Sequence, residues 1–105
     1  MSTVTLAGRQ VDVDSEGFLS DPAQWDRSIA EAIARENAIA ELTPRHWEVI
    51  DFMRTSYEER GEAPSVRALA KSSGVPIKEL YELFPKGPAK LAAKIAGVPK
   101  PRGCI

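Results

Sequence analysis

A chain of 105 residues is long enough for one small domain, and a hydrophobic fraction of 43% can supply its core. The single cysteine excludes an internal disulfide, and with it the disulfide frameworks of small secreted proteins. No apolar run approaches the ~20 residues that cross a membrane. The first 14 residues also lack the apolar core of a targeting segment, so we expect a cytoplasmic protein.

The net charge of -1 is unevenly distributed. Residues 1–44 carry three basic and eight acidic side chains, a balance of -5, whereas residues 45–105 carry eleven basic and seven acidic ones, a balance of +4. The C-terminal part from residue 86 has no acidic side chain. Its basic residues are Lys86, Lys90, Lys94, Lys100 and Arg102. Such a tail is attracted to an anionic partner or ligand, but a solvated lysine face explains the charges equally well.

The N-terminal segment predicts a β-hairpin. Apolar stretches at residues 4–6 and 11–13 flank the turn signal Gly8, and residues 14–17 predict the exit turn. Two strands are marginally stable alone, so we expect the hairpin to lie on the helices.

Two helices are predicted next. Asp21-Pro22 and Thr43-Pro44 each combine an N-cap residue with a proline at the first helical position. The first helix should end at Glu36-Asn37 and the second near Gly61. Residues at helical spacing predict the buried face of the first helix: Trp25, Ile29, Ala32 and Ile33.

Three shorter helices are predicted over residues 64–70, 77–84 and 89–96, separated by glycine and proline breaks. Regular structure should end at Gly97, because two prolines within the last eight residues disfavour helix and central strand. We therefore predict a mainly α fold: a small orthogonal helical bundle with an N-terminal hairpin. The whole chain forms one domain, 1–105, with residues 97–105 as a flexible C-terminal arm.

Residues 66–81 resemble a helix-turn-helix, with a short helix, a glycine turn and a second helix. DNA readers place basic or amide side chains near the start of the second helix. Here Lys78 is followed by two carboxylates, Glu79 and Glu82, which repel phosphates. Apolar residues of the same helix predict core positions: Ile77, Leu80, Leu83 and Phe84. We interpret the element as architectural and keep a DNA-binding regulator as an alternative.

Metal and hydrolytic chemistry find little support. The only histidine, His46, and the only cysteine have no metal-ligand spacing, and the chain has neither a phosphate-binding loop nor a nucleophile elbow. We expect no metal and no cofactor, and we interpret His46 as a packing or capping residue of the second helix.

Cys104 is the candidate reactive group. Free cysteines are usually buried, yet this one follows Pro-Lys-Pro-Arg-Gly, a stretch that is difficult to pack. From Gly97 an extended arm reaches roughly 25 Å, far enough to enter a partner's active site. Lys100 and Arg102 favour the nucleophilic thiolate, whereas the nearby C-terminal carboxylate opposes it. A spare terminal cysteine without a role is the alternative.

Several motifs together resemble the DsrC/TusE family of sulfur carrier proteins. The C-terminal signature comprises residues 83–90, 94–101 and the penultimate Cys104 followed by Ile105. The turn at residues 14–19, Trp25 and the motif at residues 46–50 extend the resemblance upstream over nearly the whole chain.

The resemblance implies a mostly helical fold with a hairpin, and a carrier that takes sulfane sulfur as a persulfide on Cys104. In the TusE branch, sulfur comes from an upstream relay complex and goes to the enzyme that thiolates the wobble uridine of certain tRNAs. In the DsrC branch, a second cysteine on the preceding helix lets the protein handle sulfur as a trisulfide with dissimilatory sulfite reductase.

The chain departs from the DsrC branch at Ala93, which stands where the second cysteine is expected. We therefore expect a TusE-like, sulfurtransferase-type persulfide carrier in tRNA thiolation, acting as a stoichiometric relay component rather than a stand-alone catalyst. The alternative is a single-cysteine, DsrC-like carrier or regulator in sulfur oxidation or sulfite reduction. The segment 71–78 also looks shorter than is usual in the family, so partner identity stays open.

The implied partners are proteins, a persulfide donor and an acceptor; we expect neither membrane binding nor direct nucleic-acid binding. Basic side chains are the candidate docking residues, with ordinary surface charge as the alternative: Arg67, Lys90, Lys94, Lys100 and Arg102.

Overall fold

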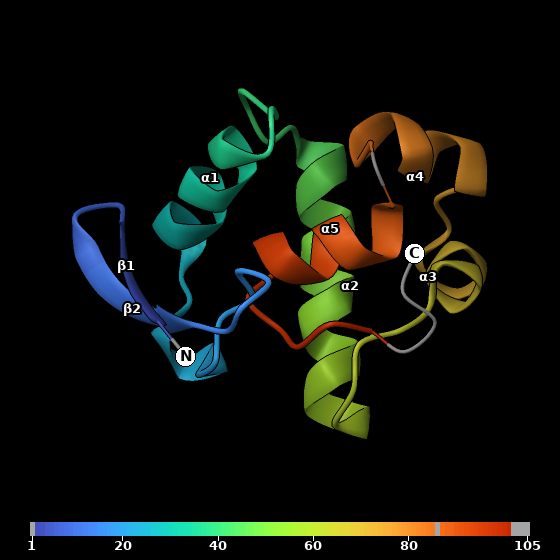
Figure 1. The fold of residues 1–105 in the computed structure, drawn as a ribbon. Coiled ribbons are helices and arrows are strands. Elements are labelled where there is room, and N and C mark those ends of the chain that lie inside the picture. Colours follow the sequence, from blue (N-terminus) through green and yellow to red (C-terminus); the bar gives the residue numbers. More distant parts are fainter. Residues whose placement is uncertain (1, 86, 102–105) are drawn as a thin grey trace.

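The computed structural model describes residues 2–85 and 87–101, which form an N-terminal hairpin followed by five α-helices (Figure 1). Strands β1 (Ser2–Leu6) and β2 (Arg9–Val13) pair antiparallel, with Val4 opposite Val11. Ala7 and Gly8 both have positive φ, 53° and 77°, as a type I′ turn requires. β1 contacts helix α1, so the predicted packing of the hairpin on the helices is confirmed.

The first predicted helix is interrupted at Trp25. Asp21 caps a single 3-10 turn, η1 (Pro22–Gln24), and Trp25 then adopts extended backbone. The α-helix α1 (Arg27–Glu36) starts only after a second N-cap, Asp26, whose carboxylate accepts from Ile29 N–H. Trp25 was expected on the buried face of a continuous helix. The continuity of the helix is wrong, because the two caps divide the segment, but Trp25 is partly buried and packs against the core as expected.

Helix α2 (Pro44–Arg60) has the expected limits. Thr43 accepts from the backbone of His46, and His46 Nδ1 accepts from Thr43 N–H at 3.0 Å, which closes a capping box. Gly61 ends the helix in the left-handed conformation.

Three short helices complete the bundle: α3 (Val66–Ser73), α4 (Ile77–Leu83) and α5 (Pro88–Ile95). Helix α3 continues three residues beyond the predicted Ala70, since the residues up to Gly74 contain no helix breaker. Leu80 of α4 and Phe84, the C-cap residue of that helix, are buried as predicted, but Ile77 is 45% exposed and is not a core residue. Ile77 is the first residue of α4 and lies at its exposed N-terminal end, between the exposed Pro76 and Lys78.

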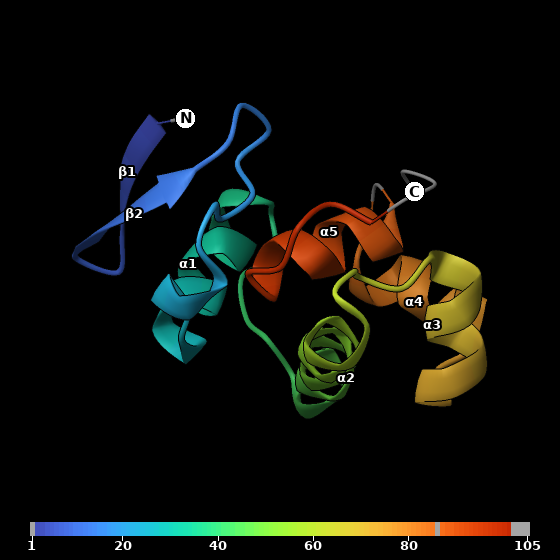
Figure 2. The ribbon, with the colours of Figure 1, turned by 90° about the horizontal axis from the view of Figure 1, so that it is seen from below.

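Helix α5 is the centre of the fold. It crosses α2 and contacts α1, α3 and α4 as well (Figures 1 and 2). Its inward residues are small, and Ala92 and Ala93 are fully buried, which allows the neighbouring helices to approach closely. The predicted orthogonal bundle is confirmed. Within the described residues, no helix is long and apolar enough to cross a membrane.

Candidate functional site

The segment after α5 doubles back along that helix (Figures 1 and 2). Gly97 makes the reversal with φ 71°, and Val98 donates its N–H to Ala93 O at 3.1 Å. Val98 and Pro101 are buried. We call residues 98–101 the strap. The flexible arm was expected to begin at Gly97; in the structure, residues 97–101 lie against α5 with buried side chains at Val98 and Pro101 and a backbone hydrogen bond from Val98.

Two side chains hold the end of α5, where the strap begins. Trp25 donates its indole N–H to Ile95 O at 2.8 Å, and Arg54 donates to Ala96 O at 2.8 Å. The Arg54 guanidinium also lies 4.1 Å from the centroid of the Trp25 ring. These donors satisfy carbonyls at the end of α5, where the helix dipole favours a positive charge.

Burial lowers the pKa of Arg54, and the charge of Glu58 opposes this effect in part. Within the described residues, the Arg54 guanidinium donates to two backbone carbonyl oxygens, Ala96 O at 2.8 Å and Pro22 O at 3.5 Å. The half-buried guanidinium of Arg54 therefore fixes the direction of the backbone where the strap begins.

Glu16 connects the far end of the strap to α5. Its carboxylate lies 3.0 and 3.2 Å from Lys100 Nζ and 3.6 Å from Lys90 Nζ. The hydrogen bond from Lys100 is the main cause that lowers the pKa of Glu16. Because Lys90 lies in the first turn of α5, one carboxylate bridges the helix and the strap.

The turn that carries Glu16 is built by Asp14. One oxygen of the Asp14 carboxylate accepts from the N–H groups of Glu16 and Phe18, at 2.9 and 3.0 Å. Phe18 is fully buried, and Lys94 Nζ lies 5.2 Å from the centroid of its ring. The predicted exit turn thus forms part of the surface beside α5.

Three of the predicted docking residues gather beside this turn, namely Lys90, Lys94 and Lys100. Arg67 is exposed on α3 and makes no side-chain hydrogen bond or ion pair with another described residue. Cys104 and Arg102 lie outside the described residues. Glu16 and Arg54 were not predicted as site residues. For Arg54 the sequence offered one signal, since a charged residue among the apolar positions of α2 indicates a buried or half-buried role.

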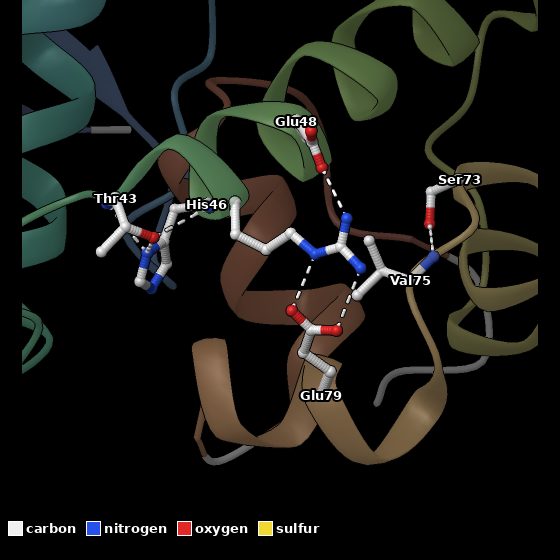
Figure 3. Close-up of polar contacts among 7 residues, drawn as sticks. Thr43, His46, Glu48, Ser73, Val75 and Glu79 are labelled. Carbon is white, nitrogen blue, oxygen red and sulfur yellow. Dashed lines mark hydrogen bonds and ion pairs between the residues drawn. The ribbon is translucent and has the colours of Figure 1, made fainter.

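A second polar cluster fastens α4 to the start of α2 (Figure 3). Arg45 binds Glu79 through Nε and Nη2, at 2.7 and 3.1 Å, and Glu48 through Nη1 at 2.9 Å. These carboxylates raise the pKa of Arg45, and Arg45 in turn lowers the pKa of Glu79. Glu79 lies where the recognition helix of a DNA-binding protein would face phosphate, but its carboxylate is paired with Arg45 of the same chain.

His46 is 7% exposed and bonded through both ring nitrogens. Nδ1 accepts from Thr43 N–H, and Nε2 lies 2.9 Å from Leu83 O, so the ring carries its proton on Nε2. The ring also meets Phe84 edge to face at 5.2 Å. The predicted packing and capping role of His46 is confirmed. Among the described residues, no group of three potential metal ligands comes together.

Comparison with known proteins identifies what this arrangement resembles. The family described as "DsrC like protein" matches residues 5–105, a range that includes the penultimate cysteine. The dissimilatory-type sulfite reductase gamma subunit of Nitratidesulfovibrio vulgaris strain Hildenborough is 43% identical, with all of both chains covered. The sulfurtransferase TusE of Escherichia coli K12 is 44% identical, covering 93% of this chain and 95% of TusE.

Among solved structures, DsrC of Allochromatium vinosum superposes with a TM-score of 0.86 at 44% identity, covering 98% of this chain and 97% of that one. The alignment with the gamma subunit spans 105 positions and all 105 residues of this chain. Because every aligned position holds a residue of this chain, that relative has no inserted residues. The expected shortening of residues 71–78 is therefore not seen in this comparison. The alignment with TusE also spans 105 positions but covers only 93% of this chain, so it includes positions that this chain lacks.

Proposed function

Because the chain belongs to the DsrC/TusE family of sulfur-relay proteins, we propose that it carries sulfane sulfur as a persulfide on Cys104 and delivers it to an acceptor protein in tRNA wobble-uridine thiolation. The observation that carries this proposal is the family match, which extends to residue 105 and so includes the penultimate cysteine. The relay acts stoichiometrically, in the cytoplasm, where the thiol stays reduced.

In the proposed transfer, the Cys104 thiolate attacks the terminal sulfur of a donor persulfide. A new S–S bond forms on Cys104 while the S–S bond of the donor breaks, and the donor leaves as a thiolate. The sulfane sulfur keeps its oxidation level, so no external oxidant or reductant is needed. The same exchange, with Cys104 as the leaving thiolate, passes the sulfur to the acceptor.

The sulfur must leave the molecule, because the chain holds no second thiol. Ala93, at the position expected for the second cysteine of the DsrC branch, is fully buried in α5. A single-thiol carrier releases its sulfur only to another molecule.

A DsrC-like role with a dissimilatory sulfite reductase is the second candidate. It is favoured by the full-length alignment with the gamma subunit, whereas the alignment with TusE requires positions that this chain lacks. Trisulfide chemistry of that branch requires a second cysteine, and this chain has Ala93 at the expected position. A single-cysteine carrier or regulator would reconcile both observations.

Loading is tested by intact-mass measurement. The protein is incubated with polysulfide, or with a cysteine desulfurase and L-cysteine, beside the Cys104→Ala variant. We expect a gain of one sulfur atom in the wild type and none in the variant. A wild type that gains no sulfur from either source refutes the carrier function.

Transfer of the sulfur to an acceptor distinguishes the two candidate functions. The loaded protein is offered to a tRNA-thiolating enzyme with tRNA, and separately to a dissimilatory sulfite reductase, and loss of its persulfide is followed by mass. Loss in the first reaction, together with thiolated tRNA, supports the first role, and loss only in the second supports the other. Salt-dependent, sequence-selective binding to duplex DNA, with no delivery in either reaction, would instead support a DNA-binding regulator.

A further inference from the structure

We propose that the free edge of β1, together with the groove beside it, docks an extended acidic segment of a partner protein. The segment adds to β1 as a third strand, sets an aliphatic side chain into the groove and places a carboxylate beside Lys90 and Lys94 of α5. The docking site goes beyond the carrier function and does not depend on Cys104.

The backbone of β1 is open on one side. Asp12 of β2 donates its N–H to Gln24 Oε1 at 2.8 Å and accepts from Ser20 N–H at 2.8 Å, so its backbone groups point away from β1. Thr3, which lies opposite Asp12, therefore directs its own N–H and C=O to the other side. Thr5 does the same, because backbone direction repeats at every second residue of a strand. Within the described residues, only β2 pairs with β1.

This free edge lacks the features that usually protect an edge strand, namely charged side chains, prolines and bulges. The sequence of β1 is Ser-Thr-Val-Thr-Leu, the first four residues are exposed, and the pairing with β2 is regular from Ser2 to Leu6. The hairpin also lies at the periphery of the molecule (Figures 1 and 2). Thr3 and Thr5 therefore each offer one N–H and one C=O to an added strand.

A cavity of about 240 Å³ adjoins β1. Its apolar lining comes from the inner face of the hairpin and from α1: Val4, Leu6, Val13 and Ile33. Val4 is the accessible member, with 37% of its surface exposed. In a third strand, every second side chain points to the same face as Val4 and Leu6. An aliphatic residue at such a position enters this cavity.

A second cavity of about 170 Å³ continues from the first and carries positive charge. The two cavities share Asn37 and Lys94, and Lys90 and Leu91 complete the lining of the second. Among the described residues, no acidic side chain lines this second cavity. Lys94 makes no ion pair with another described residue, and its ammonium group lies 5.2 Å from the centroid of the Phe18 ring. We call the two cavities together the groove, which has an aliphatic part and a cationic part.

The neighbouring carboxylates leave this positive charge largely available. Glu16 lies 3.6 Å from Lys90 but bonds Lys100 more closely, at 3.0 Å. Glu36 lines the first cavity, but it is exposed, whereas Lys94 is half-buried. Water therefore screens the charge of Glu36 more strongly. A second copy of this chain is a poorer occupant than an acidic segment, because its β1 has no carboxylate for the two lysines.

NMR titration with a peptide tests the docking. The ¹⁵N-labelled protein at low salt receives the blocked peptide Thr-Thr-Val-Thr-Asp-Thr-Thr, whose valine and aspartate lie on one face of a strand. We expect saturable shifts, downfield for the amide protons of Thr3 and Thr5, which gain acceptors. A peptide with lysine in place of the aspartate should bind more weakly. Absence of saturable shifts with the aspartate peptide, or shifts confined to residues outside the hairpin and the groove, would overturn the proposal.

Charge variants test the cationic part of the groove. Lys94→Gln should weaken binding of the aspartate peptide about two- to fivefold, as expected for loss of an exposed ion pair, and Glu36→Gln should strengthen it. The matched control is Lys71→Gln, since Lys71 is exposed on α3 and forms no ion pair with another described residue. Wild-type affinity in Lys94→Gln would overturn the proposal.

A backbone variant tests the free edge. Thr5→Pro removes an N–H that points away from β2, a position at which edge strands tolerate proline. Binding should weaken about fivefold, which corresponds to one hydrogen bond, whereas Thr5→Val keeps the N–H and should bind like the wild type. Equal binding by the two variants would overturn strand addition. The amide spectrum reports whether Thr5→Pro is folded, and if it is not, Lys94→Gln decides.

Two further measurements separate the possible occupants and the two proposals. Sedimentation under reducing conditions should show a monomer. A dimer that Thr5→Pro dissociates would mean that a second copy occupies the edge, and would overturn the proposal. Cys104→Ala should bind the peptide like the wild type, and Lys94→Gln should load sulfur normally. Failure of the docking site therefore leaves the carrier function intact, and the reverse also holds.

Discussion

Arg54 and Trp25 act as one unit: the guanidinium lies 4.1 Å from the centroid of the indole ring, and both side chains donate to the last carbonyls of α5. One residue comes from the middle of α2 and the other from the break between η1 and α1. Their contact therefore joins three parts of the chain at the point where the strap begins. The direction of the strap is set by tertiary contacts and not by local sequence alone.

The first prediction concerns the indole hydrogen bond. Trp25→Phe keeps an aromatic ring under Arg54 but removes the N–H that donates to Ile95 O. Since an unsatisfied, part-buried carbonyl remains, we expect a loss of about 1–2 kcal/mol in the free energy of unfolding, measured by urea titration.

Trp47→Phe is the matched control for this variant. Trp47 also lies under an arginine, with Arg27 4.3 Å from its ring centroid, but its indole makes no hydrogen bond with another described residue. It should lose clearly less stability. Equal losses in the two variants would show that ring size, and not the hydrogen bond, is responsible.

The second prediction concerns Gly97. An added Cβ would lie 2.4 Å from Cδ1 of Trp25, and the backbone φ of 71° is unfavourable for any other residue. Gly61 has a similar φ of 75° with open space around it. Gly61→Ala should therefore cost about 1–2 kcal/mol, the left-handed penalty alone. Gly97→Ala should cost clearly more, because Trp25 must also move.

Thermal unfolding of the two glycine variants gives the comparison. A Gly97→Ala protein as stable as Gly61→Ala would mean that Trp25 yields without cost, and that the reversal at Gly97 is not fixed by this contact.

Local signals in the sequence were enough to predict most helix limits. Thr43-Pro44 and Gly61 bound α2 because caps and prolines act within a few residues. Trp25 shows where such signals fail. Its apolar spacing with Ile29 suggested one helix, but Asp26 accepts from the backbone of Ile29 and starts a new helix instead.

The surroundings of the strap were harder to predict, because they depend on contacts between distant segments. Two prolines suggested a free arm from Gly97, whereas Glu16 binds Lys100 across 84 positions of sequence. No periodicity reveals such a pair. Cys104 itself was found from composition and the family signature, and its role stays a prediction.

The third prediction concerns His46, which accepts from Thr43 N–H and bonds Leu83 O. His46→Phe fills similar space but leaves both backbone groups without their partner. We expect a loss of about 1–3 kcal/mol in the free energy of unfolding. Urea titration measures it, and a loss below this range would mean that water replaces the ring nitrogens.

The final prediction is a pH dependence carried by Glu79. The hydrogen bond from Arg45 lowers the pKa of this carboxyl group below its ordinary value of 4.5. A carboxyl group whose pKa is lowered by folding stabilises the folded state above its unfolded pKa. That contribution is lost as the pH falls through the folded pKa. Glu48 shares Arg45, and its carboxylate keeps the guanidinium partly engaged when Glu79 is protonated.

Urea titrations of the wild type and Glu79→Gln at a series of pH values test this. At neutral pH the variant should be the less stable protein, and the difference should shrink below pH 4.5 as Glu79 takes up a proton. The matched control is Glu82→Gln, since Glu82 is exposed on the same helix and forms no ion pair with another described residue. A stability difference for Glu79→Gln that persists unchanged into acid would mean that the lost contact is not ionic. Arg45 would then hold α4 by packing and not by charge.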